Sequence, residues 1–343
     1  MIKPLSIIAL ILCVIGFALY FYEQDTEQAQ EDMSGQALLK ELDSKNLNKI
    51  QIQSSEGLLE LHQSQQGWKE IGLDYPLSSE KIQEFLLELT DLRLGDLVTI
   101  DPKRHALFRL LDPPSEKQEW DEGKHATTVS LMRGDDSKLL EIYLGKNREQ
   151  GSGQYLRYGG NDEVYLLPES LEIDTDPNEW LNKSLLKLND QMIQKITIQK
   201  SSDPTFTLNY DNESKRWILV EDPETALKDD IINDMKKRLE DLSFSKIISG
   251  SVSDNSSGRT ELTVMDVALI DGYIYSLQVG EKENSDGNHV MSLRMSIQIE
   301  SDSPDLRKEM ERFNQRNGDL LFEIRSWEAK DLLKKQVDFL KED

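Results

Sequence analysis

The stretch Lys49-Ile50-Gln51-Ile52-Gln53 decides the fold of this chain, because Lys195-Ile196-Thr197-Ile198-Gln199 repeats its pattern later in the sequence. Apolar residues that alternate with polar ones are typical of a strand with one buried face. The triplet Leu-Leu-Lys precedes both strands, at 38–40 and 185–187, and recurs at 332–334, so both intervals are 147 residues. Self-similarity at so long a period predicts two copies of a whole domain.

Each copy reads as the same succession of short strands, one amphipathic helix and further strands. The helix of each copy carries an apolar stripe at helical spacing, made by Ile82, Phe85 and Leu89 in the first copy and by Ile232, Met235 and Leu239 in the second. Turn signals such as Gly151-Ser152-Gly153 separate the later strands, which include 154–158 and 290–299, and predict hairpins. We therefore predict an α+β fold in which each copy is a mainly antiparallel sheet with packed helices.

The repeat also sets the expected domain boundaries. A length of 343 residues suits two domains, and we assign residues 36–175 to the first repeat domain and 176–343 to the second. The second copy carries a helical insertion at 303–317, where Ser303-Pro304 is a typical helix start because proline suits the first helical position. The chain closes with a predicted helix at 326–341.

An uncharged apolar run, Leu5 to Tyr22, predicts a transmembrane anchor over residues 1–22. As a helix, the run would be about 27 Å long, which is close to the thickness of a bilayer core. Lys3 precedes the run and acidic residues follow it, so the positive-inside rule places the N-terminus in the cytoplasm. Residues 23–35 then form a stalk, and the remainder lies in the periplasm of a single-pass inner-membrane protein.

A cleaved signal peptide is the alternative to the anchor. The apolar core of a signal peptide usually has about 7–15 residues and ends at a small-x-small cleavage site. Here the run continues into Tyr20-Phe21-Tyr22, which favours the anchor. Under either interpretation, the rest of the chain lies outside the cytoplasm.

The charge of the chain limits its partners. The formal net charge is −24, so the surface repels nucleic-acid phosphates and anionic lipid headgroups, and we expect no nucleic-acid partner. Such charge serves solubility, or it attracts a cationic partner or weakly binds divalent ions. The only cysteine, Cys13, lies in the apolar run, so the rest of the chain has neither a disulfide nor a thiolate ligand.

The sequence contains no pattern that indicates catalysis, a cofactor or a metal. We found no Gly-x-Ser-x-Gly motif and no phosphate-binding loop. The acidic loops 253–258 and 283–288 loosely resemble calcium loops but lack the register and terminal glutamate, so they are predicted to be turns. No metal-binding spacing relates the four histidines, His62, His105, His125 and His289. We therefore predict no catalytic, cofactor-binding or metal-ligating residues.

Apolar stripes on the two helical additions are the candidate partner surface. An element that the shared core does not require can hold such a stripe for a partner, or can use it to cover an edge of its own sheet. The candidate contact residues are Leu306, Met310 and Phe313 in the insertion and Leu333, Val337 and Leu340 in the C-terminal helix.

An ordered set of motifs resembles the bacterial family catalogued as domain of unknown function 4340, in tandem copies over nearly all of residues 36–343. The motifs are Gly67-Trp68, Leu110-Leu111-Asp112-Pro113, Leu144-Gly145, Gln154-Tyr155-Leu156-Arg157, Val164-Tyr165-Leu166-Leu167 and Trp180-Leu181. The resemblance implies a single-pass envelope protein encoded beside ABC-type export or gliding-type transporter components, and it implies no catalytic residues. The second copy lacks the Leu-Asp-Pro and Tyr-Leu-Arg elements.

The expected function is therefore that of a non-enzymatic accessory or scaffold component of such a membrane complex. Two alternatives stay open. A glycan- or peptidoglycan-binding module would use Trp68, Tyr155 and Tyr158 as stacking residues and would present them in one row. A hydrolase would need two carboxylates that face one cleft with perturbed pKa values.

Overall fold

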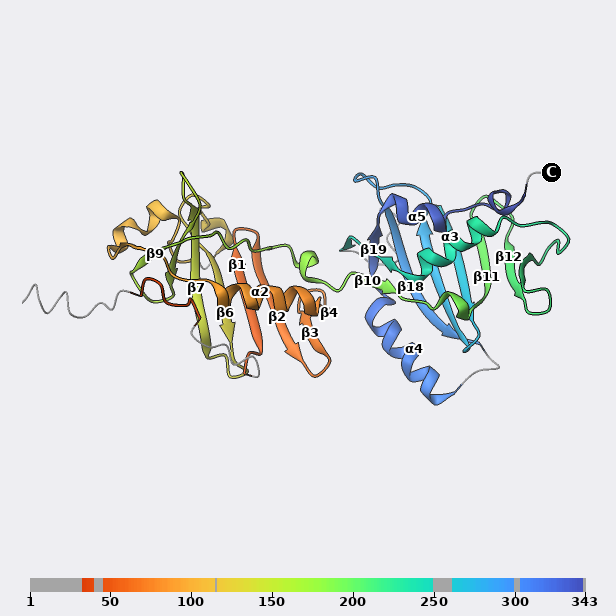
Figure 1. Ribbon diagram of the computed structural model, residues 1–343, viewed down its shortest axis with the longest axis horizontal. Coiled ribbons are helices and arrows are strands. Elements are labelled where there is room, and N and C mark those ends of the chain that lie inside the picture. Colours follow the sequence, from red (N-terminus) through yellow and green to blue (C-terminus); the bar gives the residue numbers. More distant parts are fainter. Residues whose placement is uncertain (1–32, 40–45, 115, 249–260, 299–302, 342–343) are drawn as a thin grey trace, which may run out of the picture. The chain divides into compact units, whose positions relative to one another are not determined.

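The computed structural model describes residues 33–39, 46–114, 116–248, 261–298 and 303–341 (Figure 1). The chain forms two compact units, Met1–Glu179 (unit 1) and Trp180–Asp343 (unit 2). Each unit contains one large antiparallel sheet, which confirms the predicted α+β class with two mainly antiparallel sheets. The predicted anchor lies outside the described residues. Among the helices of the described part, none is long and apolar enough to cross a bilayer.

The sheet of unit 1 has nine strands in the order β4-β3-β2-β1-β6-β7-β8-β9-β5. The strands are β1 (Lys49–Ser54), β2 (Gly57–Ser64), β3 (Gly67–Glu70), β4 (Tyr75–Pro76), β5 (Leu97–Thr99), β6 (Thr127–Met132), β7 (Lys138–Asn147), β8 (Gln154–Tyr158) and β9 (Val164–Leu167).

The sheet of unit 2 has eight strands in the order β13-β12-β11-β16-β17-β18-β19-β15. The strands are β11 (Ile193–Lys200), β12 (Phe206–Asp211), β13 (Arg216–Leu219), β15 (Lys246–Ile248), β16 (Leu262–Leu269), β17 (Tyr273–Gly280), β18 (His289–Ile297) and β19 (Leu321–Ile324). A separate pair joins β10 (Ser184–Leu186) to β14 (Leu242–Ser243).

One helix follows the first strands of each unit, as the apolar stripes predict (Figure 1). Helix α2 (Ser79–Asp91) begins after Ser78, whose side chain accepts a hydrogen bond from Lys81 N, and α3 (Asp229–Glu240) is its counterpart. The six residues of the predicted stripes are all buried. Burial of each such side chain stabilises the fold by roughly 1.5–3 kcal/mol.

The remaining helices are one of 14 residues and several shorter ones. They are α4 (Pro304–Asn317), α5 (Ser326–Leu332) and the 3-10 helices η1 (Pro102–Phe108), η2 (Lys117–Glu119), η3 (Pro177–Trp180), η4 (Asp190–Met192) and η6 (Gln336–Phe339). The structure differs from the single C-terminal helix predicted at 326–341, because α5 ends at Leu332 and η6 follows after a break. The Lys200 ammonium donates to the carbonyl of Leu333 at 3.0 Å and thereby satisfies a helix-end acceptor at the break.

The two large sheets share their strand order. Read from β3 to β5, unit 1 matches unit 2 strand for strand from β13 to β15. The register agrees as well: the cross-strand partners are Leu61 and Leu131 for Ile50, and Leu208 and Val267 for Ile196. The same residue positions therefore form the buried face in both units.

The two units differ at the end of β8 in unit 1. Tyr158, paired with Ile142, corresponds to Leu293, paired with Leu277. In unit 1 the chain then turns at 159–163 into β9, whereas in unit 2 β18 continues to Ile297 and α4 lies in the connection to β19. A Cβ at Gly159 would lie 2.1 Å from the Glu141 carboxylate, and Gly160 has a φ of +78°, so glycines end the strand here.

Candidate functional site

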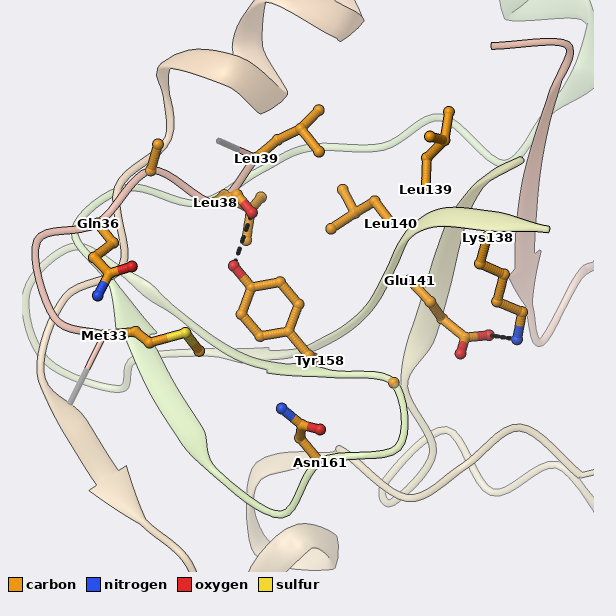
Figure 2. A pocket seen from close by; sticks show the side chains of 12 residues that line it. Met33, Gln36, Leu38, Leu39, Lys138, Leu139, Leu140, Glu141, Tyr158 and Asn161 are labelled. Carbon is orange, nitrogen blue, oxygen red and sulfur yellow. Dashed lines mark hydrogen bonds and ion pairs between the residues drawn. The ribbon is translucent and has the colours of Figure 1, made fainter. Parts of the chain in front are cut away.

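The end of β8 borders a cavity of about 560 Å³, which we name the edge groove (Figure 2). Three segments form its walls: the N-terminal segment 33–39, the beginning of β7 and the turn after β8. The lining residues are Met33, Gln36, Ala37, Leu38, Leu39, Lys138, Leu139, Leu140, Glu141, Tyr158, Gly159 and Asn161.

The N-terminal wall of the edge groove is fixed by backbone hydrogen bonds to the end of α2. Leu38 N donates to Leu92 O at 2.9 Å, and Leu94 N donates to Gln36 O at 2.9 Å. The Tyr158 hydroxyl donates to Leu38 O at 2.8 Å across the groove, as Figure 2 shows. Burial raises the pKa of Tyr158 to about 12, so this hydroxyl stays a neutral donor at physiological pH. The wall is thus tied to both the helix and the sheet.

The base of the edge groove is apolar and its rim is polar. Leu38, Leu39 and Leu140 are buried. On the rim, Lys138 and Glu141 form an ion pair at 2.5 Å, in which the Lys138 side chain is half exposed. The Glu141 side chain is only 20% exposed, so the charge that this pair presents to solvent is mainly that of Lys138.

The beginning of β7 gives the edge groove an open strand edge. On one side, β7 pairs with β6 as far as Lys138. On the other side, the pairing with β8 ends at Ile142, and Gly159 N makes one further hydrogen bond to Glu141 O at 2.9 Å. Within the described residues, no strand pairs with 138–140 on this side. An open edge of this kind can accept an added strand.

A buried arginine supports the turn that closes the groove. Arg157 Nε donates to Leu110 O at 2.8 Å, Nη1 donates to Asn161 O at 3.3 Å, and Nη2 pairs with the Asp112 carboxylate. Its guanidinium lies 4.0 Å from the ring centre of Tyr143, and burial raises the pKa of that tyrosine. The Leu-Asp-Pro and Tyr-Leu-Arg motifs therefore meet in space and fix the loops of unit 1.

The aromatic residues of the glycan alternative do not form one row. Strand register places Trp68 and Tyr158 on the sheet face that also carries Leu61 and Ile142. Tyr155 projects from the opposite face, because side chains alternate along a strand. Its ring packs against Phe108 at 4.6 Å.

The predicted contact residues of the insertion are half-buried on α4. The Phe313 ring lies 5.4 Å from the ring of Tyr275. The Asn314 amide accepts from Met295 N at 2.8 Å and donates to Met295 O at 2.7 Å, so α4 occupies the edge of β18. The stripe of α4 therefore has an internal partner in its own sheet.

The predicted contact residues of the C-terminal segment lie on other elements. Leu340 forms a bridge with Leu227, just before α3, and Val337 on η6 is exposed. Leu333 follows α5 and binds Lys200 through its carbonyl, as described above. The structure therefore does not join these residues to α4 in one described surface.

The polar clusters of unit 2 are hydrogen-bonded turns. In the loop 283–288, the amides of Asn284 and Asn288 donate to the buried Glu323 carboxylate at 2.6 and 3.0 Å. Ser326 and His289 line one small pocket, so we compared them with a catalytic nucleophile and its base. Ser326 Oγ donates to Glu283 Oε1 at 2.5 Å, and the His289 ring contacts Gly280 O. The two side chains are therefore not hydrogen-bonded to each other, as a nucleophile and base would be. Within the described residues, no group of three or more His, Cys, Asp or Glu could hold a metal ion. The loop 253–258 lies outside them.

Sequence reasoning did not find the edge groove. The signal that could have revealed it is the difference in length between the strands predicted at 154–158 and 290–299. A shorter strand in one of two equivalent sheets leaves part of its neighbour unpaired.

Comparison with known proteins gives one match. The family model described as domain of unknown function (DUF4340) matches residues 68–261, from β3 of unit 1 to the residue before β16 of unit 2. This single span takes parts of both units, so tandem family copies stay a prediction. No curated protein and no solved structure matches the chain. Because the match covers more than half of the 343 residues, the chain belongs to the DUF4340 family.

Proposed function

We propose that the chain is a single-pass inner-membrane protein whose periplasmic part binds a partner protein. In this role it serves as a non-enzymatic accessory or scaffold component of an ABC-type export or gliding-type membrane complex. The observation that carries the proposal is the edge groove, which combines a buried apolar base, a polar rim and an open strand edge.

The position of the groove in the sequence supports a partner close to the membrane. Met33, the first lining residue, follows Tyr22, the last residue of the predicted anchor, by eleven positions. At roughly 3.3–3.6 Å per extended residue, the connection reaches at most about 40 Å. A partner in the groove therefore contacts this chain within about that distance of the bilayer.

Charge supports a cationic partner segment. The formal net charge of −24 attracts basic surfaces and raises the rate of encounter with them. The glycan alternative has less support, since Tyr155 faces away from Trp68 and Tyr158.

Affinity purification from detergent-solubilised membranes tests this proposal. The tagged wild-type chain should recover transporter subunits, and Leu139→Lys in the groove should lower their recovery about tenfold, as loss of a central contact does. Leu107→Lys is the matched control, because Leu107 is an exposed leucine on η1 outside the groove. Absence of transporter subunits from the wild-type sample, or equal recovery with both variants, would contradict the proposal.

A further inference from the structure

The second unit of the chain shows what fills the region that is open in the first. The register of β7 against β6 shifts at Lys138 and Leu139, so Leu140 and Tyr275 are the last residues with matching partners on that side. Counted from Ile142 and Leu277, which lie opposite Tyr158 and Leu293, residues 138–140 of β7 correspond to 273–275 of β17. In unit 2 they pair with Met295, Ser296 and Ile297, the last residues of β18. In the part of unit 1 that the structure describes, no residues take this place, because the chain turns away at Gly160.

The segment 295–297 at the end of β18 has one buried side chain and polar neighbours. Met295 is 5% exposed and lies opposite Tyr275, whose counterpart in unit 1 is the buried Leu140. Arg294 and Ser296 beside it are exposed. The segment thus places one apolar side chain over the sheet and turns polar ones to solvent, as alternation along a strand requires.

We propose that the edge groove binds an extended segment of a partner protein, which adds to residues 138–140 of β7 as a short antiparallel strand. This inference rests on the proposed function and specifies how the partner is held. The segment carries an apolar residue that packs over Leu140 and Leu38. Backbone hydrogen bonds supply affinity and the apolar position supplies selectivity, as in other strand additions.

The chain itself does not supply this segment to a second copy. Residues 295–297 are already paired with β17 in their own sheet, and α4 holds Met295 through Asn314. The net charge of −24 also disfavours another copy of this acidic chain as the partner.

A peptide that copies the paired segment provides the probe. We would label the peptide Met-Ser-Ile-Gln, which is the sequence of residues 295–298, because residues 292–294 correspond to 157–159, which already lie beside β7 in unit 1. Its fluorescence anisotropy is measured against the full chain in detergent. We expect saturable binding, a loss of affinity of at least tenfold when the peptide methionine is replaced by aspartate, and a similar loss when its serine is replaced by proline, which removes a backbone donor.

Two variants at one position separate the strand edge from its side chain. Leu139 lies at the irregularity in the β6–β7 pairing, where proline is tolerated. Leu139→Pro removes the backbone N–H and should weaken peptide binding at least tenfold, whereas Leu139→Ala keeps the N–H and should weaken it about threefold or less. The control is thermal unfolding of both variants, in which each should melt as a folded protein if the sheet is retained.

Hydrogen exchange gives a reading that does not depend on any variant. Saturating peptide should slow exchange in the fragment that contains Leu139 at least tenfold. Three results would overturn the proposal: no binding up to about 1 mM peptide, binding without slower exchange at this fragment, or exchange that is already slow in the free chain. If the peptide does not bind but transporter subunits are still recovered, the strand site is wrong and the proposed function stands. If the peptide binds but no transporter subunits are recovered, the strand site stands and the proposed function is wrong.

Discussion

At the scale of single residues, unit 1 depends on buried polar groups that connect segments far apart in the sequence. Arg157 reaches Leu110 and Asp112, which lie some 45 positions earlier, while Tyr158 reaches back to Leu38. Each of these side chains satisfies a backbone carbonyl that the fold removes from water. Polar groups of this kind are costly to leave unpaired, so they fix one arrangement of the loops around the groove.

The Arg157 cluster predicts an unequal pair of mutational effects. Arg157→Ala leaves the buried carbonyl of Leu110 and the partly buried carbonyl of Asn161 without this donor, and should lower the free energy of unfolding by about 3 kcal/mol. Asp112→Asn should cost less than about 1 kcal/mol, because the Asp112 side chain is 74% exposed. Urea titration followed by circular dichroism measures both. Equal effects would show that the ion pair, rather than the carbonyl bonds, supplies the stability.

Two tyrosines predict a loss of stability in alkali. Burial raises the pKa of Tyr158 and of Tyr275 to about 12, from an ordinary value near 10. Between pH 10 and 12 the unfolded chain therefore loses protons that the folded chain keeps, so stability falls as the pH rises. The double variant Tyr158→Phe with Tyr275→Phe should show a smaller fall between pH 9 and 11 than wild type, measured relative to each protein's own stability at pH 7. An identical fall would contradict this assignment.

At the scale of elements, the principal difference between the units is the connection that follows the strand pair at Tyr158 and Leu293. In unit 2 the strand continues and α4 covers its edge through Phe313 and Asn314. In unit 1 glycines turn the chain away, and among the described residues no strand pairs with this edge. Two sheets with the same strand order therefore differ at this edge. In unit 2 helix α4 covers the edge, and in unit 1 the edge borders the groove.

Helix α4 is expected to behave as part of the fold. Met310→Asp with Phe313→Asp places two charges against the sheet and should lower the melting temperature by about 5 °C or more. Lys308→Asp is the control, since Lys308 is exposed on the same helix. A double variant that melts like wild type but loses transporter subunits in purification would instead assign α4 to the partner surface.

At the scale of the whole molecule, the two sheets share their order over eight strands, and the register agrees around Ile50 and Ile196. This agreement is what two copies of one domain would produce, and tandem family copies stay a prediction. The predicted anchor also predicts on which side of the membrane the two units lie. A reporter enzyme that is active only outside the cytoplasm, fused after Asp343, should be active in cells. Activity of a cytoplasmic reporter alone would contradict the proposed orientation.

Much of this fold follows from local patterns. The alternation at Ile50 and Ile52 and the stripe of Ile82, Phe85 and Leu89 each predict an element that the structure contains. The edge groove does not follow from such patterns. It depends on where β8 ends relative to β7, and on the segment 33–39 lying beside strands more than a hundred residues later. Periodicity describes which face of an element is buried, but it carries no information on such long-range neighbours.

If the edge groove holds a partner beside the membrane, cross-linking in living cells tests this most directly. A photo-activated phenylalanine analogue placed at Leu139 should cross-link to a subunit of a membrane transport complex, and the same analogue at the exposed Leu107 of η1 should not. Absence of a cross-linked protein at Leu139, or the same product from both positions, would contradict the account.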